Sequence, residues 1–446
     1  MADVADIRTG RLSAVALAEN FADVHRPLDP AAALVDANRC YFCYDAPCIG
    51  ACPTGIDVPG FIRAIATGNV TGAALTILQE NIFGGSCARV CPTEILCQGA
   101  CVRNGDSDRP VQIGLLQRRA TDHVKSDARH PFTRAPATGR TVAVVGAGPA
   151  GLACAHGLAR QGHDVIVFEA RSKPGGLNEF GIAAYKVPDN FAQEEVSFIT
   201  AIGGIEIHSD RTLGRDLTLA QLRLDFDAVF LGLGQDGVRA LDAPGADLTG
   251  VHNAVDYIAA LRQADDLAKL PVGRRVVVIG GGNTAIDIAV QTKRLGADDV
   301  TIFYRRGPVQ MGATHHEQDF AQINGVRIKH WLRPLRIDNH EGAVTAAVFA
   351  AVGQDDSGSL ADTGAEQTIP CDMVFKAVGQ TFVPLGQGGP ELAAGRIAVG
   401  PNGQTSLPDV WAGGDCVAGE DLTVQAVQDG KLAARAMDLF LRNMEA

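Results

Sequence analysis

Residues 141–169 have the sequence TVAVVGAGPAGLACAHGLARQGHDVIVFE, and they define the first clear structural unit of the chain. The first five residues predict an apolar strand, the pattern G-x-G-x-x-G follows at 146–151, and a helix is expected up to the next apolar run, DVIVF. That run predicts a second strand, which ends in Glu169, 23 residues after Gly146. This order of strand, glycine turn, helix and acid-terminated strand is the fingerprint of a dinucleotide-binding βαβ unit.

The residue types of this unit suit the diphosphate and ribose of a dinucleotide. Glycines allow a tight turn and let the backbone approach a pyrophosphate, and the N-terminus of the following helix stabilises its negative charge. The carboxylate at the end of the second strand can accept hydrogen bonds from ribose hydroxyls. The dinucleotide contacts expected here are Gly146, Gly148, Pro149, Ala150, Gly151 and Glu169.

A second unit of the same kind begins with the strand RVVVI at 275–279 and continues with GGGNTA at 280–285. Its second strand, 300–304, ends in Arg305 and Arg306 instead of an acid. Arginine at this position usually accommodates the 2′-phosphate of NADPH; the alternative is a pair of solvated surface arginines. The expected nicotinamide-dinucleotide contacts are Gly280, Gly282, Asn283, Thr284, Ala285, Arg305 and Arg306.

Near the end of the sequence, VWAGGD at 410–415 precedes a helix predicted over 423–441. An aspartate on a Gly-Gly turn can accept a hydrogen bond from a ribityl hydroxyl, and the helix N-terminus can face a flavin pyrimidine. Alone, Asp415 is equally compatible with an ordinary turn aspartate. Together with the motifs upstream it is expected to contact FAD, as are Gly414 and Thr423.

Eight of the eleven cysteines lie between Cys40 and Cys101, in two runs of four. The runs have the spacing C-x2-C-x4-C-x3-C-P from Cys40 and C-x3-C-P-x4-C-x3-C from Cys87. Thiolates this close can bind an iron–sulfur cubane, and in two-cluster ferredoxins the last cysteine of a run ligates the other cluster. Structural zinc sites and disulfides are the alternatives, but four cysteines within thirteen residues match zinc knuckles less well, and a reducing cytosol disfavours disulfides.

The segments around the cysteines predict helices. Asp57-Val-Pro-Gly followed by Phe61, Ile62 and Ile65 predicts a capped helix with an apolar face, and 73–80 has a similar pattern. The first 130 residues are therefore expected to form a small helical domain around two clusters.

Composition limits the remaining possibilities. The 446 residues suffice for two or three domains, and 39 basic against 51 acidic residues give a net charge of −12, which disfavours binding to nucleic acid. No apolar run reaches the roughly 18 residues of a membrane span, and the start MADVADIRTG lacks the profile of a signal peptide. We expect a cytoplasmic protein that does not associate with membranes.

The predicted fold class is α/β, with an N-terminal α-helical domain carrying two iron–sulfur clusters followed by two Rossmann-like dinucleotide-binding domains. The two glycine motifs lie 134 residues apart, which predicts that the NAD(P) domain is inserted in the FAD domain. The predicted domains are 1–135 (helical iron–sulfur), 136–255 (FAD-binding, first part), 256–370 (NAD(P)-binding) and 371–446 (FAD-binding, second part).

The order of these motifs resembles the small subunit of glutamate synthase and the N-terminal half of dihydropyrimidine dehydrogenase. It comprises paired cysteine runs, an FAD motif with Gly175-Gly176-Leu177, an NAD(P) motif and a Gly-Gly-Asp turn, and it extends from about Asn38 to Lys431. CYFCYDAPC at 40–48 looks like the pyrimidine enzymes, and GLNEFGIAAYKVP at 176–188 is especially similar to their bacterial two-subunit form.

The resemblance implies a grouping of the cysteines that spacing alone does not give. One cluster would be bound by Cys40, Cys43, Cys48 and Cys101. The other would be bound by Cys52, Cys91, Cys97 and a side-chain oxygen of Gln117. Cys87 then lies outside both sets. The pyrimidine branch has glutamine at the position of Gln117 and the glutamate synthase branch has glutamate, so this residue discriminates between the two branches.

The resemblance also assigns residues to the two nucleotides. It places Gly176, Leu177 and Lys186 near the flavin, and Ala377 and Gly379 beside the nicotinamide nucleotide. The bacterial pyrimidine enzymes use NADH, which conflicts with the arginine argument above. We expect NADH, with NADPH as the alternative.

These features predict an NAD(P)H-dependent FAD iron–sulfur oxidoreductase that acts as the electron-input subunit of a dihydropyrimidine dehydrogenase. A hydride would pass from NADH to the flavin, and single electrons would then pass through two [4Fe-4S] clusters. This transfer needs no protein acid or base, so no catalytic side chain is predicted. The chain has no room for a pyrimidine-reducing FMN barrel of about 250 residues.

The resemblance therefore implies a partner in pyrimidine catabolism. It would be an FMN- and iron–sulfur-containing subunit, in a heteromer expected to be a heterotetramer, that reduces uracil or thymine to the 5,6-dihydropyrimidine or runs the reverse reaction. Two alternatives remain. One is the small subunit of a glutamate synthase-like NADPH oxidoreductase, and the other is a zinc-stabilised nucleotide-sensing module without enzymatic activity.

Overall fold

The computed structural model describes residues 6–107, 109–125, 130–354 and 358–444. By its internal contacts the chain divides into two compact units, which we describe separately. The larger unit consists of the described residues within 25–179, 189–236 and 382–446. The second unit consists of the described residues within 1–24, 180–188 and 237–381. No helix in the described ranges is long and apolar enough to cross a membrane.

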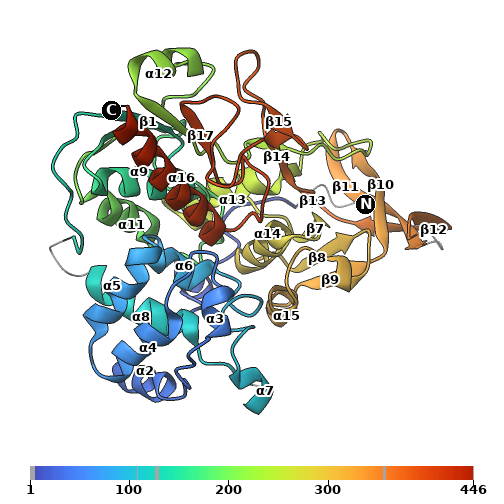
Figure 1. Ribbon diagram of the computed structural model, residues 1–446. Coiled ribbons are helices and arrows are strands. Elements are labelled where there is room, and N and C mark those ends of the chain that lie inside the picture. Colours follow the sequence, from blue (N-terminus) through green and yellow to red (C-terminus); the bar gives the residue numbers. More distant parts are fainter. Residues whose placement is uncertain (1–5, 108, 126–129, 355–357, 445–446) are drawn as a thin grey trace. The chain divides into compact units, whose positions relative to one another are not determined.

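The larger unit begins with a helical part that carries the cysteines (blue to cyan in Figure 1). Asp57 accepts a hydrogen bond from the backbone N–H of Gly60, and Asn69 accepts one from Gly72, so these residues cap the two helices that follow them. The helices are α2 (Pro30–Ala37), α3 (Pro47–Gly50), α4 (Val58–Ala66), α5 (Val70–Glu80), α6 (Gly84–Val90), α7 (Arg103–Ser107) and α8 (Ile113–Lys125).

The second part of this unit is a parallel five-stranded sheet with the strand order β17-β4-β1-β2-β3. Its strands are β1 (Thr141–Val145), β2 (Asp164–Phe168), β3 (Ile205–His208), β4 (Ala228–Leu231) and β17 (Val410–Ala412). The strand order reverses between β1 and β4, and in such sheets ligands bind beyond the carboxyl ends of the strands at this point. The accompanying helices are α9 (Pro149–Arg160), α11 (Phe191–Thr200), α12 (Leu219–Asp225) and α16 (Thr423–Asn443).

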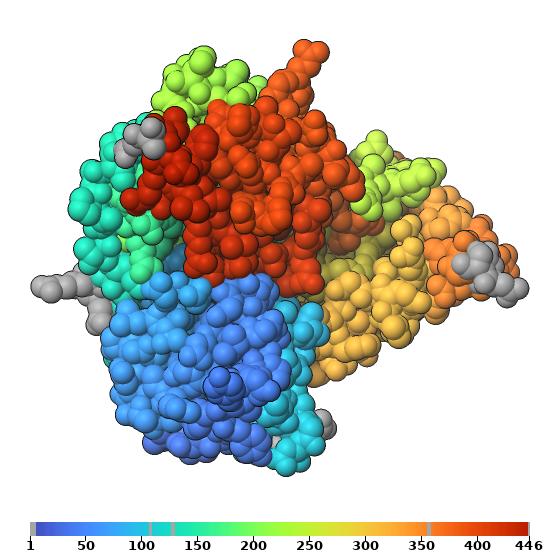
Figure 2. Space-filling model, in the orientation of Figure 1, coloured from blue at the N-terminus to red at the C-terminus, as the bar shows by residue number. Residues whose placement is uncertain are grey.

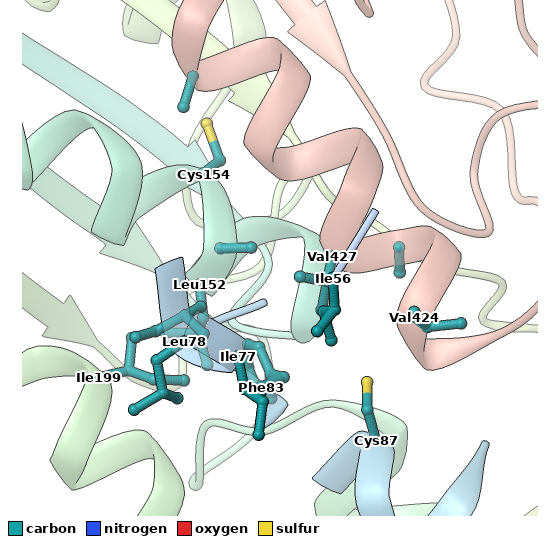
Figure 3. Close-up of a cluster of buried hydrophobic side chains, with 14 of the residues drawn as sticks. Ile56, Ile77, Leu78, Phe83, Cys87, Leu152, Cys154, Ile199, Val424 and Val427 are labelled. Carbon is teal, nitrogen blue, oxygen red and sulfur yellow. The ribbon is translucent and has the colours of Figure 1, made fainter. Parts of the chain in front are cut away.

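One continuous core joins the helical part to the sheet part of this unit. Figure 3 shows that Ile77 and Phe83 from the cysteine-bearing helices, Leu152 from α9 and Val424 and Val427 from α16 belong to the same buried cluster. In the space-filling view, the blue helical segment borders the red C-terminal segment that contains α16 (Figure 2), and α6 contacts this helix. The cysteine-bearing helices therefore do not form an isolated domain.

The second unit contains a parallel sheet with the order β6-β13-β7-β8-β9. Its strands are β6 (Val251–Asn253), β13 (Met373–Ala377), β7 (Arg275–Gly280), β8 (Asp299–Tyr304) and β9 (Arg327–His330). An antiparallel sheet that the sequence did not predict is formed by β10 (Leu332–His340), β11 (Ala343–Gln354) and β12 (Leu360–Pro370). The helices are α1 (Ala14–Asn20), α13 (Ala254–Arg262), α14 (Asn283–Arg294) and α15 (His315–Ile323).

Residues 6–24 belong to this second unit, whereas the domain boundaries predicted from the sequence place them with the cysteines. The reason is apolar burial, because Leu17 and Phe21 pack into the core of the NAD(P)-type sheet. Arg8 also pairs with Val272 through backbone hydrogen bonds.

The remaining elements are short. They are α10 (Leu177–Phe180), two 3-10 helices (Leu267–Lys269 and Pro308–Gln310), β5 (Gly237–Val238), β14 (Gln380–Thr381), β15 (Leu392–Ala393) and β16 (Arg396–Ile397). With one Rossmann-like sheet interrupted in sequence by the other, the predicted α/β fold class is confirmed.

Candidate functional site

The first glycine motif lies at the carboxyl end of β1 and opens α9. Gly146 has φ +98°, and a Cβ on it would lie 2.3 Å from the carbonyl oxygen of Gly232, beyond the end of β4. A Cβ on Gly151 would lie 1.9 Å from the carbonyl oxygen of Gly146, so helix and turn meet without side chains between them. A Cβ on Gly148, by contrast, would have its nearest neighbour at 3.8 Å.

Gly148 is the N-cap of α9, and Pro149 and Ala150 occupy the first turn of this helix. Proline is favourable there because its missing N–H has no partner in the helix. Unpaired backbone N–H groups and the positive end of the helix dipole favour an anion at this position. The predicted residues of the first motif therefore form a cradle that fits a pyrophosphate.

Glu169 ends β2 and is buried beside this turn. Its carboxylate accepts hydrogen bonds from the backbone N–H groups of Ala147 at 2.8 Å and Arg171 at 2.9 Å. Burial raises the pKa of Glu169, and these two bonds act against that rise. The predicted ribose-binding acid thus also fixes the conformation of the glycine turn.

The segment 175–178 lies against the same turn. Gly176 has φ +55°, and a Cβ on it would lie 2.7 Å from the Cα of Gly148. Leu177 begins α10 and is 39% exposed. The hydroxyl of Thr423, the first residue of α16, lies 3.2 Å from Oδ1 of Asn178.

The Gly-Gly-Asp segment completes this group of residues. A Cβ on Gly414 would lie 2.9 Å from the Cβ of Ala150, and the backbone N–H of Gly414 donates to Asp429 at 2.9 Å. Burial raises the pKa of Asp415 to about 6. Among the described residues, none donates a hydrogen bond to the Asp415 carboxylate. A largely buried acceptor without a protein partner fits a ligand hydroxyl, such as one on the ribityl chain of FAD.

The second glycine motif has the corresponding geometry in the other unit. A Cβ on Gly280 would lie 2.1 Å from the carbonyl oxygen of Ala377 at the end of β13, so these two predicted residues adjoin. Gly282 caps α14 and has no atom within 4 Å of a built Cβ, and the same is true of Gly379, which has φ +105°. Asn283, Thr284 and Ala285 form the first turn of α14.

Arg305 and Arg306 follow β8 directly, and both are exposed. Neither guanidinium makes a hydrogen bond or ion pair with the described residues. Both groups are available for a 2′-phosphate, but the same exposure is compatible with two solvated surface arginines.

Lys186 lies in a buried ion network of the second unit. Its Nζ lies 2.9 Å from Oδ1 of Asp287 on α14 and 2.7 Å from Oε1 of Glu317 on α15. Burial lowers the pKa of Lys186, but the two carboxylates raise it more strongly, so that it lies above its usual value. Burial raises the pKa of Asp287. The sequence analysis did not identify Asp287 and Glu317 as partners of Lys186. The signal that could have indicated Asp287 is that an acid lies on the apolar face of the helix predicted after Gly282.

The first cysteine group comes from both ends of the helical part. Cys40, Cys43, Cys48 and Cys101 line one pocket, whose walls also include Val58 and Pro59 of α4. Burial raises the pKa of Cys40, and raises that of Cys48 to about 11 with a contribution from neighbouring cysteines. The structure thus brings together the four residues that the resemblance assigns to one cluster.

The second group contains Cys52, Cys91 and Cys97. Burial raises the pKa of Cys97 to about 12, and Cys52 adds to the rise through electrostatic repulsion; the neighbours of Cys91 are Cys87, Cys97 and Cys52. Cys87 is buried one helical turn before Cys91. Thiols gathered this closely fit a positively charged iron core, which stabilises their thiolate forms.

In the described residues no set of three or more Cys, His, Asp or Glu side chains could hold a metal ion on its own. A cubane differs from such a site because its protein ligands bind different iron atoms and need not converge on one point.

Gln117 is buried on α8, which packs against α6. Its side-chain N–H donates to the backbone carbonyl of Gly84 at 2.8 Å. Only the amide nitrogen can donate to a carbonyl, so the amide oxygen is directed elsewhere. It accepts no hydrogen bond from the described residues and is therefore free to act as a ligand.

A comparison with protein-family models defines the class of protein. Residues 140–430 match the pyridine nucleotide-disulphide oxidoreductase model, and residues 17–129 match dihydropyrimidine dehydrogenase domain II, 4Fe-4S cluster. The chain belongs to the pyridine nucleotide-disulphide oxidoreductase family, and it is an NAD(P)H-dependent FAD iron–sulfur oxidoreductase. The predicted FAD, [4Fe-4S] and NAD(P)H cofactors are confirmed.

Individual relatives are more specific. The chain is 35% identical to the NAD-dependent dihydropyrimidine dehydrogenase subunit PreT of Salmonella typhimurium, over 95% of this chain and 98% of that protein. It is 34% identical to the glutamate synthase [NADPH] small chain of Escherichia coli, over 93% and 92%. The predicted resemblance is confirmed, and both relatives are parts of heteromeric enzymes.

Among solved structures, Mycobacterium tuberculosis FprA in complex with NADPH has a TM-score of 0.56 and 20% identity, over 70% of this chain and 86% of that one. At this identity the likeness shows the fold alone.

Proposed function

We propose that this chain is the electron-input subunit of a cytoplasmic NADH-dependent dihydropyrimidine dehydrogenase. Its partner would be an FMN- and iron–sulfur-containing subunit that reduces uracil or thymine to the 5,6-dihydropyrimidine, or catalyses the reverse reaction. The observation that carries the proposal is the buried Gln117, whose amide oxygen accepts no hydrogen bond from any residue that the structure describes. The glutamate synthase branch has glutamate at this position.

We assign the cluster ligands accordingly. The first cluster is bound by Cys40, Cys43, Cys48 and Cys101, which share one pocket. The second is bound by Cys52, Cys91, Cys97 and Oε1 of Gln117. The bond from Gln117 to Gly84 orients the amide, and a neutral oxygen ligand in place of a fourth thiolate makes this cluster less negative.

The remaining predicted residues bind and orient the two nucleotides. The glycine turn at 146–151 and Glu169 bind the FAD diphosphate and ribose, and Asp415 accepts a hydrogen bond from the ribityl chain. The turn at 280–285 binds the nicotinamide dinucleotide, with Ala377 and Gly379 beside it. When bound, the flavin accepts a hydride and the clusters carry single electrons.

The pyrimidine reaction requires the partner. The relative with 98% of its length covered is itself named a subunit, and the parallel sheets that the structure describes are the two five-stranded Rossmann-like sheets. An FMN barrel of the usual size would need about 250 further residues.

The test is the activity of the native complex. The tagged chain is purified anaerobically from its own host with its bound partner, and NADH oxidation is measured with uracil, with thymine, and with glutamine plus 2-oxoglutarate. Oxidation that depends on uracil or thymine and is absent from the isolated chain supports the proposal. Oxidation only with glutamine and 2-oxoglutarate, or only with an artificial dye, refutes the pyrimidine assignment.

The glutamate synthase-like function is the second candidate, because Arg305 and Arg306 are exposed, their guanidinium groups have no partner in the described parts of the chain, and the small-chain relative is named for NADPH. The same assay with NADPH in place of NADH distinguishes the two candidates.

The assignment of Gln117 has its own test. Replacing Gln117 with Leu removes the oxygen ligand, and we expect one of the two clusters to be lost, halving the iron and acid-labile sulfide. Gln117→Glu keeps an oxygen ligand and is expected to retain both clusters. Gln112→Leu, on the loop before α8, is the control. Full iron content in Gln117→Leu would exclude this residue as a ligand.

A further inference from the structure

Helix α16 connects the FAD-type glycine motif to the loop of the second cysteine group. On one side it packs closely against α9, because a Cβ on Gly430 would lie 2.1 Å from the carbonyl oxygen of Ala150. The next residue, Lys431, reaches the cysteine-bearing part of the same unit. Figure 3 shows Val427, one turn earlier on α16, in the same buried cluster as Ile56 from that part.

Lys431 makes two polar contacts. Its Nζ donates to the backbone carbonyl of Thr54 at 2.8 Å and to Oε2 of Glu80 at 2.9 Å, and its side chain is only 16% exposed. Thr54 follows Cys52 by two residues, and its hydroxyl lies 3.3 Å from the Cys52 sulfur. The ammonium group is thus attached to the loop that presents this cysteine.

The charge of Lys431 is not fully neutralised by Glu80. The same Oε2 of Glu80 also lies 3.9 Å from Arg435, and Arg160 interacts electrostatically with Glu80. Three cations, Lys431, Arg435 and Arg160, therefore interact with one carboxylate. The charge of Cys52 acts electrostatically on Lys431, so the two groups are within interaction range of each other.

We propose that Lys431 is a positioning residue that raises the reduction potential of the cluster bound through Cys52. This proposal rests on the ligand set of the proposed function. Reduction adds one electron to a cluster and makes or breaks no bond, so the cluster becomes one charge more negative. A nearby cation stabilises this reduced state more than the oxidised one, and net charge near a cluster is one determinant of its potential.

The effect should be specific to this cluster because Coulomb interactions weaken with distance. The first cysteine group has a different cation nearby, Arg63, which acts on Cys40. Removing Lys431 should therefore shift one of two midpoint potentials more than the other.

The experiment is an anaerobic redox titration of the isolated holo chain, with dithionite and mediator dyes, followed by EPR. We expect Lys431→Met to lower the equilibrium constant for reduction of this cluster on the order of tenfold, which is about 59 mV for one electron. Lys431→Arg should keep the wild-type potential. Arg435→Met removes a charge that contacts Glu80 but not the cysteine loop, and should give a smaller shift.

Glu80→Gln supplies a second test that retains the lysine. Because it removes the negative charge, we expect it to raise the potential of the same cluster, a change of sign that a merely structural contact would not produce. Unchanged potentials in Lys431→Met and Glu80→Gln, or equal shifts of both clusters, would overturn the proposal. Where Lys431→Met does not assemble the cluster, an unshifted Glu80→Gln decides against it. The titration uses neither NADH nor a partner, so its result is independent of the pyrimidine assay.

Discussion

The carboxylate of Glu169 accepts a 2.8 Å hydrogen bond from the backbone N–H of Ala147, inside the glycine turn that precedes α9. The acid at the end of β2 therefore shapes the turn before any nucleotide is bound. Replacing Glu169 with Gln leaves one oxygen for the two N–H donors, those of Ala147 and Arg171. Hydrogen bonds to charged groups contribute about 1.5–3 kcal/mol, so we expect FAD affinity to fall at least tenfold.

Fluorescence titration of FAD into the deflavinated chain measures this change. Glu206→Gln is the matched control, because Glu206 is an acid on the adjacent strand β3 whose side chain is 70% exposed. Equal FAD affinity in Glu169→Gln and Glu206→Gln would contradict the role of Glu169.

A second prediction concerns the contact of α16 with α9. In Gly430→Ala the new Cβ would lie 2.1 Å from the carbonyl oxygen of Ala150 and 3.0 Å from the backbone nitrogen of Cys154, so the helices must separate. Overpacking of this kind costs about 1–3 kcal/mol, and we expect a lower melting temperature together with lower FAD content. Gly419→Ala, with no atom within 4 Å of its Cβ, should match the wild type. Wild-type stability in Gly430→Ala would show that this contact is not close in solution.

A third prediction follows from Asp415, whose pKa burial raises to about 6. Because the folded chain binds this proton more tightly than the unfolded chain, the charged form destabilises the fold. This destabilisation develops as the pH rises from about 4 to about 6 and is complete above that range. Asp415→Asn should therefore raise the unfolding free energy of the FAD-free chain by on the order of 2 kcal/mol at pH 7.5, and by less at pH 5.

The same substitution should weaken FAD binding, because the amide is a poorer acceptor for a ribityl hydroxyl. Melting curves at the two pH values, with and without FAD, separate the two effects. A gain in stability that is equal at both pH values would contradict the titration of Asp415.

Local pattern was sufficient for the two glycine motifs. The strand predicted at 141–145 coincides with β1, and the run after Gly162 coincides with β2, because apolar strands bounded by glycine turns leave few alternatives. The helix predicted over 73–80 begins three residues earlier, at Val70, since Asn69 caps it. In each case the information lies within a few residues of the element.

Long-range partners could not be predicted in this way. Cys101 joins Cys40 in one pocket across sixty residues, and spacing alone did not reveal this pairing. Three more features are also tertiary contacts: the position of Gln117 beside α6, the pairing of Lys186 with Asp287 and the packing of Leu17 into the core of the second unit. The antiparallel sheet was missed because β11 is apolar along most of its length and shows no simple alternation.

A fourth prediction concerns the buried network of Lys186. Lys186→Met leaves Asp287 and Glu317 without their cation, and breaking a buried pair in this way typically costs about 3–5 kcal/mol. Burial raises the pKa of Asp287, and the loss of the lysine raises it further, so the destabilisation should be larger at pH 8 than at pH 5.5. Thermal unfolding at both pH values tests this.

The double variant Lys186→Met/Asp287→Asn removes one of the two unpaired charges and should recover part of the lost stability. Lys269→Met, an exposed lysine of the same unit, is the control. A Lys186→Met variant as stable as Lys269→Met at pH 8 would show that the network makes no net contribution.

The last prediction separates the two nicotinamide nucleotides through Arg305 and Arg306. Both arginines lie after β8 and are exposed, and their guanidinium groups have no partner among the described residues, so they are available to a charged group of the ligand. NADH lacks the 2′-phosphate that would engage them. We expect the wild-type chain to have the higher kcat/KM with NADH, and the double variant Arg305→Ser/Arg306→Ser to change that value less than twofold. Its kcat/KM with NADPH should fall about tenfold, as loss of a charged phosphate contact predicts.

The control is Arg336→Ser, which changes another surface arginine of this unit and should leave both kcat/KM values unchanged. These kcat/KM values are measured by steady-state kinetics with ferricyanide as the electron acceptor. If the wild-type chain instead has the higher kcat/KM with NADPH, and the double variant abolishes this preference, the nucleotide assigned to the chain becomes NADPH.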